Sequence, residues 1–211
     1  MTVTTIPTAG IADDAVGNTK LDLSANYAFT GTVTGTPQVF VQITKTTLSG
    51  TATAWNPIFT SDYDNYMVQF DNVGSTATGT QVFFKFYNET GATSDNIYRG
   101  RTQIIDSNGT DRSQNYQNSY PKLTSNMDGN STGTGMNLSL FVYQPLNATV
   151  MTQYSYIGSY GRTDGYMAYI LGGGGTTDYA TREHTGLYLY LEGGGSFTGR
   201  SQLTLYGIKR T

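Results

Sequence analysis

The sequence predicts an all-β fold, a two-sheet β-sandwich of the jelly-roll type that follows an extended N-terminal arm. Short runs of alternating apolar and polar residues follow one another from residue 37 onward, and no long stretch has helical periodicity. Thr and Tyr, which favour strands, are frequent. The segments between the runs differ in length, which suits two packed sheets better than a meander. An immunoglobulin-like topology ranks second and a closed barrel third.

The composition narrows the classes of function. Only 13% of the 211 residues are charged, against roughly 25% in ordinary globular domains, so hydroxyl and amide groups must solvate the surface. A net charge of −3 without a Lys/Arg cluster argues against a nucleic-acid partner. The absence of Cys excludes disulfides and thiolate metal sites. Because no run reaches the ~20 apolar residues of a membrane span and no secretory signal is evident, we expect no membrane partner and folding in the cytoplasm of the producing cell.

The first 36 residues differ from the rest of the chain. Ile6, Ile11, Val16 and Leu21 recur every five residues among Thr, Ala, Gly and Asp. This spacing fits neither a helix nor a strand, and we interpret 1–36 as an extended arm and linker whose isolated apolar side chains press onto a neighbouring surface. A partly disordered lead-in is the alternative. Gly and Pro punctuate the end of this segment, so the β-sandwich domain is predicted at 37–211.

The strands are predicted from two-residue alternation. In the clearest run Val82, Phe84 and Phe86 share one face, and Phe83 and Lys85 lie on the other. The predicted strands are 39–48, 66–73, 80–88, 97–105, 136–143, 150–160, 166–171, 186–192 and 201–209. The short loop between 66–73 and 80–88 predicts that these two pair as a hairpin, and the polar stretch 106–135 is interpreted as a loop.

Glycine and tyrosine patterns give two further expectations. The run of four glycines at 172–175 lacks the Lys-Ser/Thr of a phosphate loop and is interpreted as a flexible or tightly turned connection. Tyr154 with Tyr156, and Tyr188 with Tyr190, are predicted on the strand face opposite the aliphatic stripe. Half-buried Tyr is favoured at interfaces, so these pairs are expected at oligomer contacts.

No residue pattern indicates catalysis. His184 is the only histidine, and its neighbour Glu183 would point to the opposite face of a strand, so we interpret His184 as a surface loop residue. No nucleophile elbow or zinc motif is present. Asp62 with Asp64, and the stretch 106–111, resemble fragments of calcium loops without the terminal Glu, and Asx-turns explain them equally well. We therefore expect no enzymatic activity, no cofactor and no bound metal.

Two stretches resemble a known class of proteins. Residues 6–16 (IPTAGIADDAV) and 21–35 (LDLSANYAFTGTVTG) resemble linker regions of tailed-bacteriophage fibre and virion surface proteins, particularly from phages of marine bacteria. Residues 197–209, with LTLYGI at 203–208, are similar to the terminal strand of jelly-roll modules in such proteins. These stretches cover a minor part of the chain. The middle of the chain matches such proteins only in composition, which is rich in Thr, Asn, Gly and Tyr.

The resemblance implies a virion surface protein, typically a homotrimer, whose N-terminal segment attaches to the particle while the sandwich faces outward. A capsid decoration protein (cement or head fibre) bound to the major capsid protein is expected first, because the chain begins at its own Met and has no shaft of repeats. A tail fibre or receptor-binding tip, bound to tail proteins and a host glycan or outer-membrane protein, is the alternative. A carbohydrate-binding module also stays open.

Each alternative assigns its own contact residues. In a decoration protein, the apolar residues of the arm would contact the particle: Ile6, Ile11, Val16 and Leu21. In a receptor-binding protein, the loops 106–135 and 172–186 would carry stacking platforms for the receptor. The candidate platforms are Tyr116, Tyr120, Tyr160, Tyr166 and Tyr179.

Overall fold

The computed structural model describes residues 39–91, 97–117, 120–129, 135–177 and 182–208. The chain divides into two units between Pro37 and Gln38, and the described residues belong to the second unit. The predicted arm 1–36, with its four apolar contact residues, lies outside the described residues. Tyr179 lies outside them as well.

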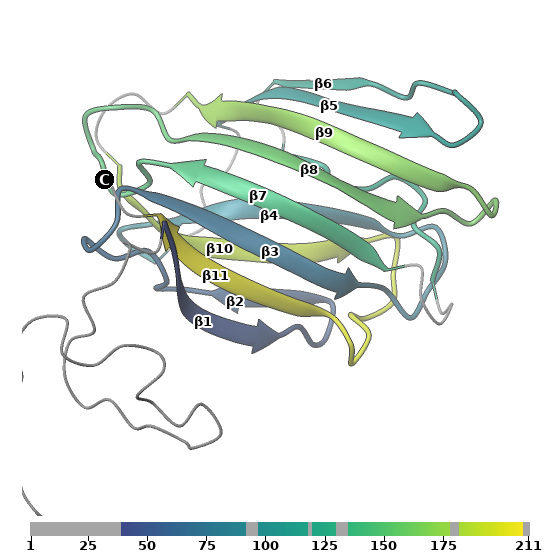
Figure 1. The fold of residues 1–211 in the computed structure, drawn as a ribbon, viewed down its shortest axis with the longest axis horizontal. Helices are drawn as coiled ribbons and strands as arrows, with labels where there is room; N and C mark the ends of the chain where they lie inside the picture. The colour runs from purple at the N-terminus through teal and green to yellow at the C-terminus, as the bar shows by residue number, and fades with distance from the viewer. Residues whose placement is uncertain (1–38, 92–96, 118–119, 130–134, 178–181, 209–211) are drawn as a thin grey trace, which may run out of the picture. The chain divides into compact units, whose positions relative to one another are not determined.

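The described residues form eleven strands and no helix, in two sheets that make a β-sandwich (Figure 1). The all-β prediction is thereby confirmed. The strands are β1 (Phe40–Thr47), β2 (Ala52–Trp55), β3 (Asn65–Val73), β4 (Gln81–Asn88), β5 (Tyr98–Asp106), β6 (Gln114–Gln117), β7 (Met136–Tyr143), β8 (Gln153–Gly161), β9 (Met167–Thr176), β10 (His184–Glu192) and β11 (Gln202–Ile208).

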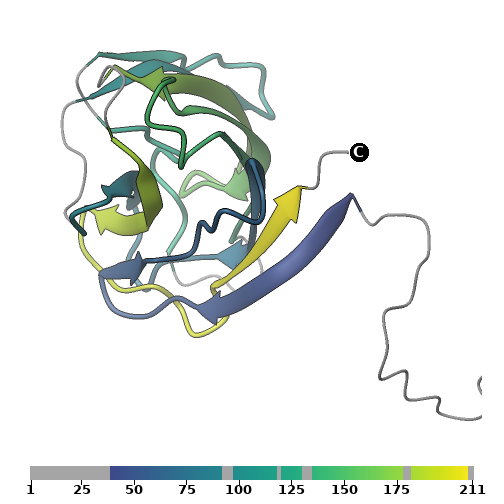
Figure 2. The same cartoon turned by 90° about the vertical axis from the view of Figure 1, so that its left-hand side faces the viewer.

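The two sheets differ in size. The large sheet has eight strands in the order β1-β11-β3-β7-β8-β9-β5-β6, and the small sheet has three in the order β2-β10-β4. Neighbouring strands are antiparallel in both. Figure 2 shows the sandwich from the side, with the two layers facing each other across the core. The strands β1 and β6 therefore lie at opposite edges of the large sheet.

The core lies between the inner faces of the two sheets, and these faces follow the predicted alternation. Val82, Phe84 and Phe86 of β4 are fully buried, whereas Phe83 and Lys85 lie on the outer face of the small sheet. From the large sheet the alternate residues of β7 and β3 point inward. The facing core residues include Val68, Phe70, Leu138, Leu140, Val142, Leu187 and Leu189.

The predicted hairpin of 66–73 with 80–88 is wrong. Strand β3 pairs with β11 and β7 in the large sheet, whereas β4 pairs with β10 in the small one. Each strand has one fully buried face, and the two faces belong to opposite sheets of the sandwich. The connecting loop therefore leads from the large sheet to the small sheet instead of turning back within one sheet. Two strands of four residues were not predicted, β2 and β6, and β6 lies within the stretch interpreted as a loop.

The glycine run 172–175 is not a connection. It forms part of β9, which pairs with β5 on one side and β8 on the other. A Cβ atom on Gly172 would lie 2.5 Å from Cζ of Tyr156, and one on Gly100 of β5 would lie 2.5 Å from Oη of Tyr116. Gly172 and Gly100 are therefore strand residues that leave room for large aromatic rings on the inner face of the sheet.

The predicted placement of the tyrosine pairs is half right. Tyr188 and Tyr190 lie half-buried on the outer face of the small sheet, opposite the buried leucines of β10. Tyr154 and Tyr156, in contrast, are 2% and 3% exposed and belong to the core. They cannot form an oligomer contact, because their rings pack inside the sandwich, where Tyr154 meets Phe84 edge-to-face at 5.2 Å between centroids.

Candidate functional site: an aromatic groove beside the small sheet

A groove with a cavity volume of about 480 Å³ lies where β6, at the edge of the large sheet, approaches β4 and β10 of the small sheet. Four segments supply its walls: β6, the segment 120–122, β4 and the end of β10. The lining residues are Phe83, Gln114, Asn115, Tyr116, Tyr120, Lys122, Tyr190, Leu191 and Glu192. The groove thus combines aromatic rings with amide, ammonium and carboxylate groups.

The segment 120–124 occupies its position because it covers the free edge of β4. The amide of Phe84 donates to the carbonyl of Pro121 at 3.3 Å, and the amide of Leu123 donates to the carbonyl of Val82 at 2.8 Å. The amide of Val82 donates in turn to Oγ1 of Thr124 at 2.9 Å. An uncovered strand edge leaves backbone donors without partners. The hydrogen bonds that cover the edge of β4 therefore place Tyr120 and Lys122 next to the small sheet.

The aromatic rings of the groove hold one another in place. Phe83 and Tyr190 are directly opposite in the pairing of β4 with β10, and their rings are nearly parallel with centroids 5.3 Å apart. The ring of Tyr120 meets Tyr190 edge-on at 6.1 Å. Nζ of Lys85 lies 3.9 Å from the centroid of Tyr120 and 5.4 Å from that of Tyr190, a cation–π arrangement. The cluster is therefore ordered by contacts within the protein.

Polar groups surround these rings. Gln114 and Asn115 are exposed on the edge strand β6, and Glu192 is exposed at the end of β10. Partial burial lowers the pKa of Lys122 from its ordinary value, while the nearby Glu192 carboxylate acts in the opposite direction. Among the lining residues one side chain carries a positive charge and one a negative charge, and the Lys85 ammonium behind two of the rings adds one more positive charge.

Tyr116 forms part of the groove wall but cannot serve as an exposed stacking platform. It is only 7% exposed, and its hydroxyl donates to the carbonyl of Gly173 at 3.1 Å and accepts from the hydroxyl of Tyr154 at 3.1 Å. Burial raises the pKa of Tyr116 above its ordinary value, so the phenol stays protonated. The expectation for Tyr116 is corrected accordingly, because its ring lies against the glycines of β5 and β9 instead of in solvent.

Two further predicted platforms, Tyr160 and Tyr166, do not line the groove. Tyr160 is fully buried, and its hydroxyl donates to the carbonyl of Ser125 at 2.8 Å, so it is a core residue and not a receptor contact. Tyr166 is 42% exposed in the turn between β8 and β9. Of the predicted platforms that the structure describes, Tyr116 and Tyr120 both line the groove, and Tyr160 and Tyr166 do not. The sequence analysis did not assign the other lining residues to a binding site: Phe83, Gln114, Asn115, Lys122, Tyr190, Leu191 and Glu192. Aromatic residues on the polar faces of two strands were a usable signal for Phe83 and Tyr190.

The expectation that His184 is a surface loop residue is wrong. His184 begins β10, is 1% exposed and packs against the ring of Phe86 with centroids 5.1 Å apart. Its Nδ1 lies 2.9 Å from Oγ1 of Thr152. The imidazole therefore bonds across the core, from the small sheet to the segment that leads into β8.

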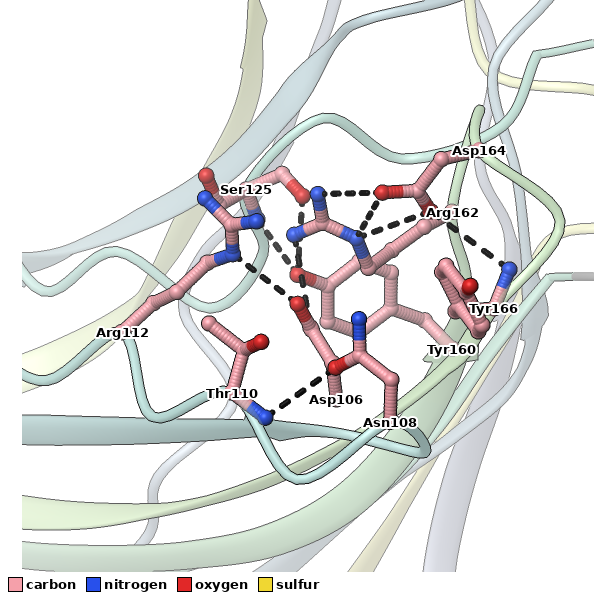
Figure 3. Close-up of polar contacts among 9 residues, drawn as sticks. All are labelled: Asp106, Asn108, Thr110, Arg112, Ser125, Tyr160, Arg162, Asp164 and Tyr166. Carbon is pink, nitrogen blue, oxygen red and sulfur yellow. Dashed lines mark hydrogen bonds and ion pairs between the residues drawn. The ribbon is translucent and has the colours of Figure 1, made fainter.

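A second polar cluster joins the turns after β5 and β8 (Figure 3). The carboxylate of Asp106, which is fully buried, lies 2.9 Å from Nε of Arg112 and 3.4 Å from Nη1 of Arg162. Arg162, 3% exposed in its side chain, also binds Asp164 through Nε and Nη2 at 2.9–3.3 Å. The nearby Asn108 accepts from the amide of Thr110 at 3.0 Å, an Asx-turn. In the stretch 106–111, which resembles a fragment of a calcium loop, the first carboxylate is thus that of Asp106, and it binds two arginines.

This cluster predicts an acid-sensitive contribution to stability. The hydrogen bonds from Arg162 hold the pKa of Asp164 below its usual range. The unfolded chain, with an Asp pKa near 3.9, then binds more protons than the folded one in acid. The contribution is therefore complete above about pH 4 and is lost as the pH falls through the folded pKa. In urea unfolding, Asp164→Asn should lose stability at neutral pH and show a weaker acid dependence than wild type. An identical acid dependence would contradict this assignment.

The other groups that could carry chemistry are sparse. No three His, Cys, Asp or Glu side chains within the described ranges lie close enough to hold a metal ion. No helix in the part of the chain that the structure describes is able to cross a membrane.

Comparisons with protein-family models, curated proteins and solved structures found no match.

Proposed function

We propose that this protein is a structural component of the outer surface of a tailed-bacteriophage particle, a trimeric capsid decoration protein held to the major capsid protein by residues 1–36. The β-sandwich would be a jelly-roll module and the leading segment an extended arm. The resemblance of residues 6–16, 21–35 and 197–209 to such proteins supports the proposal, as does the charge-poor, cysteine-free β-sandwich.

One structural observation is compatible with attachment through residues 1–36: the first strand, β1, lies at the edge of the large sheet opposite the groove. The first residue of β1, Phe40, pairs with Ile208 at the end of the last strand. The groove borders β6, at the opposite edge of the large sheet. Seven strand spacings separate the two edges, roughly 34 Å along the sheet at about 4.8 Å each. A tether at β1 would therefore leave the groove accessible to a partner.

Deletion of residues 1–24 is expected to abolish particle association while the sandwich stays folded and trimeric. Three arms joined in one trimer raise each other's effective concentration after the first binds, so loss of all three should leave no residual decoration. Particle occupancy is measured by quantitative mass spectrometry of purified virions, and folding by circular dichroism. Wild-type occupancy of the truncated protein would contradict the role of the arm.

The groove favours a second candidate, a tail fibre or receptor-binding tip. A recognition site at the sheet edge opposite β1 is what a receptor-binding subunit tethered through residues 1–36 would need. Copy number per particle distinguishes the two candidates, because a decoration protein is present in hundreds of copies and a tail protein in about a dozen. Purified protein that binds host cells and blocks infection would favour the tail.

A further inference from the structure

We infer that the aromatic groove between β6 and the small sheet binds an uncharged saccharide chain. The inference rests on the groove alone and does not depend on where the protein sits on a particle. Its volume of about 480 Å³ lies within the roughly 300–1,000 Å³ of small-molecule sites, and its open form admits a chain that continues beyond the site.

The rings supply the surface that a sugar stacks on. The face of an aromatic ring is negatively polarised and attracts positively polarised hydrogens, and one face of a pyranose ring presents such C–H groups. Phe83, Tyr120 and Tyr190 all line the groove, and their mutual contacts at 5.3 and 6.1 Å between centroids order them before a ligand arrives. A preordered site loses less conformational entropy on binding.

The polar groups of the groove match the hydroxyl groups of a sugar better than they match a charged ligand or a purely apolar one. Sugar hydroxyls both donate and accept, and the side-chain amides of Gln114 and Asn115 do the same. Lys122 adds donors and Glu192 adds acceptors. The lining residues carry one charge of each sign, and Lys85 against the rings of Tyr120 and Tyr190 adds a single positive charge, which is far from the cluster of cations that a polyanion site needs. A nucleic acid would require clustered cations, and an apolar peptide would leave these polar groups without partners.

Saturation-transfer NMR on the full chain tests the inference with defined probes: cello-, malto-, manno-, galacto- and chito-oligosaccharides at about 1 mM, a concentration that detects even weak binding. We expect transfer to at least one probe. Phe83→Ala and Tyr120→Ala should weaken that binding about tenfold or more, as the loss of a stacking contact does in single-strand binding sites. Gln114→Ala, at an exposed position on β6, should weaken it without affecting the fold.

The matched control is Tyr169→Ala. Tyr169 is 42% exposed on β9, outside the groove lining, so its removal should leave saccharide binding unchanged. The inference is overturned if no probe shows transfer, or if binding persists in Phe83→Ala, Tyr120→Ala and Gln114→Ala alike. Perturbation of groove resonances by a host surface protein but by no saccharide would also overturn it, and would assign the groove to a protein partner.

Discussion

Asp106→Ala is expected to lower the free energy of unfolding by about 3 kcal/mol, the lower end of the range for a broken buried ion pair. For a domain of this size, that corresponds to a fall in Tm of roughly 6–12 °C. Chemical denaturation and differential scanning calorimetry measure the two quantities. The substitution should destabilise the protein more than any replacement of an exposed carboxylate.

The reason is the guanidinium that Asp106 leaves behind. The side chain of Arg162 is 3% exposed, and without Asp106 its Nη1 loses the carboxylate at 3.4 Å. A buried guanidinium that has lost its partner destabilises the folded state by more free energy than the intact ion pair contributed to stability. Asp164 still binds the other side of the guanidinium, and this remaining partner keeps the expected loss near 3 kcal/mol, at the low end of that range.

Two comparisons make this prediction specific. Asp111→Ala removes an exposed carboxylate from the same turn, where it accepts hydrogen bonds from Gln103 and Ser113, and should shift Tm by no more than about 2 °C. The double variant Asp106→Ala/Arg162→Ala should lose less stability than the sum of the two single variants. Additive losses would show that the two side chains do not stabilise each other.

Strand faces were predictable from sequence wherever one face is plainly apolar. The alternation of Val82, Phe84 and Phe86 with Phe83 and Lys85 assigned β4 correctly, because a two-residue period directly reports which side chains share a face. The same period does not report which strand lies alongside. Pairing depends on contacts between segments far apart in sequence, and so the partners of β3 and β4 were assigned wrongly.

The inner face of β8 shows a second limit of the sequence. Tyr154 and Tyr156 alternate with Ser155 and Ile157, so both faces contain an apolar residue. The structure buries the tyrosines and leaves Ile157 48% exposed. This choice depends on hydroxyl partners from other strands, since Tyr156 shares a hydrogen bond with Thr102. The groove was not predicted either, because its walls come from four segments and the two-residue period does not report which segments lie side by side.

Gly174→Ala tests the role of the glycines in β9 and is expected to destabilise the protein by about 3 kcal/mol, at the upper end for overpacking. An added Cβ would lie 2.1 Å from the carbonyl oxygen of Arg99 and 2.8 Å from Cα of Gly100. Both obstacles are backbone atoms of the paired strand β5, so no side-chain rotation relieves the clash. The strands must separate locally, and thermal unfolding should show a lower Tm.

Gly199→Ala is the matched control, because a Cβ there meets nothing within 4 Å and the residue has no positive φ. Its effect should be neutral or slightly stabilising, since alanine reduces the entropy of the unfolded chain. The disturbance at Gly174 should also reach the groove. Gly100 is its direct partner in β5 and packs under the ring of Tyr116, so moving this strand shifts one groove wall. Equal stability of Gly174→Ala and Gly199→Ala would mean that β5 and β9 tolerate a side chain at this position, and that Gly174 is not required for the close approach of the two strands.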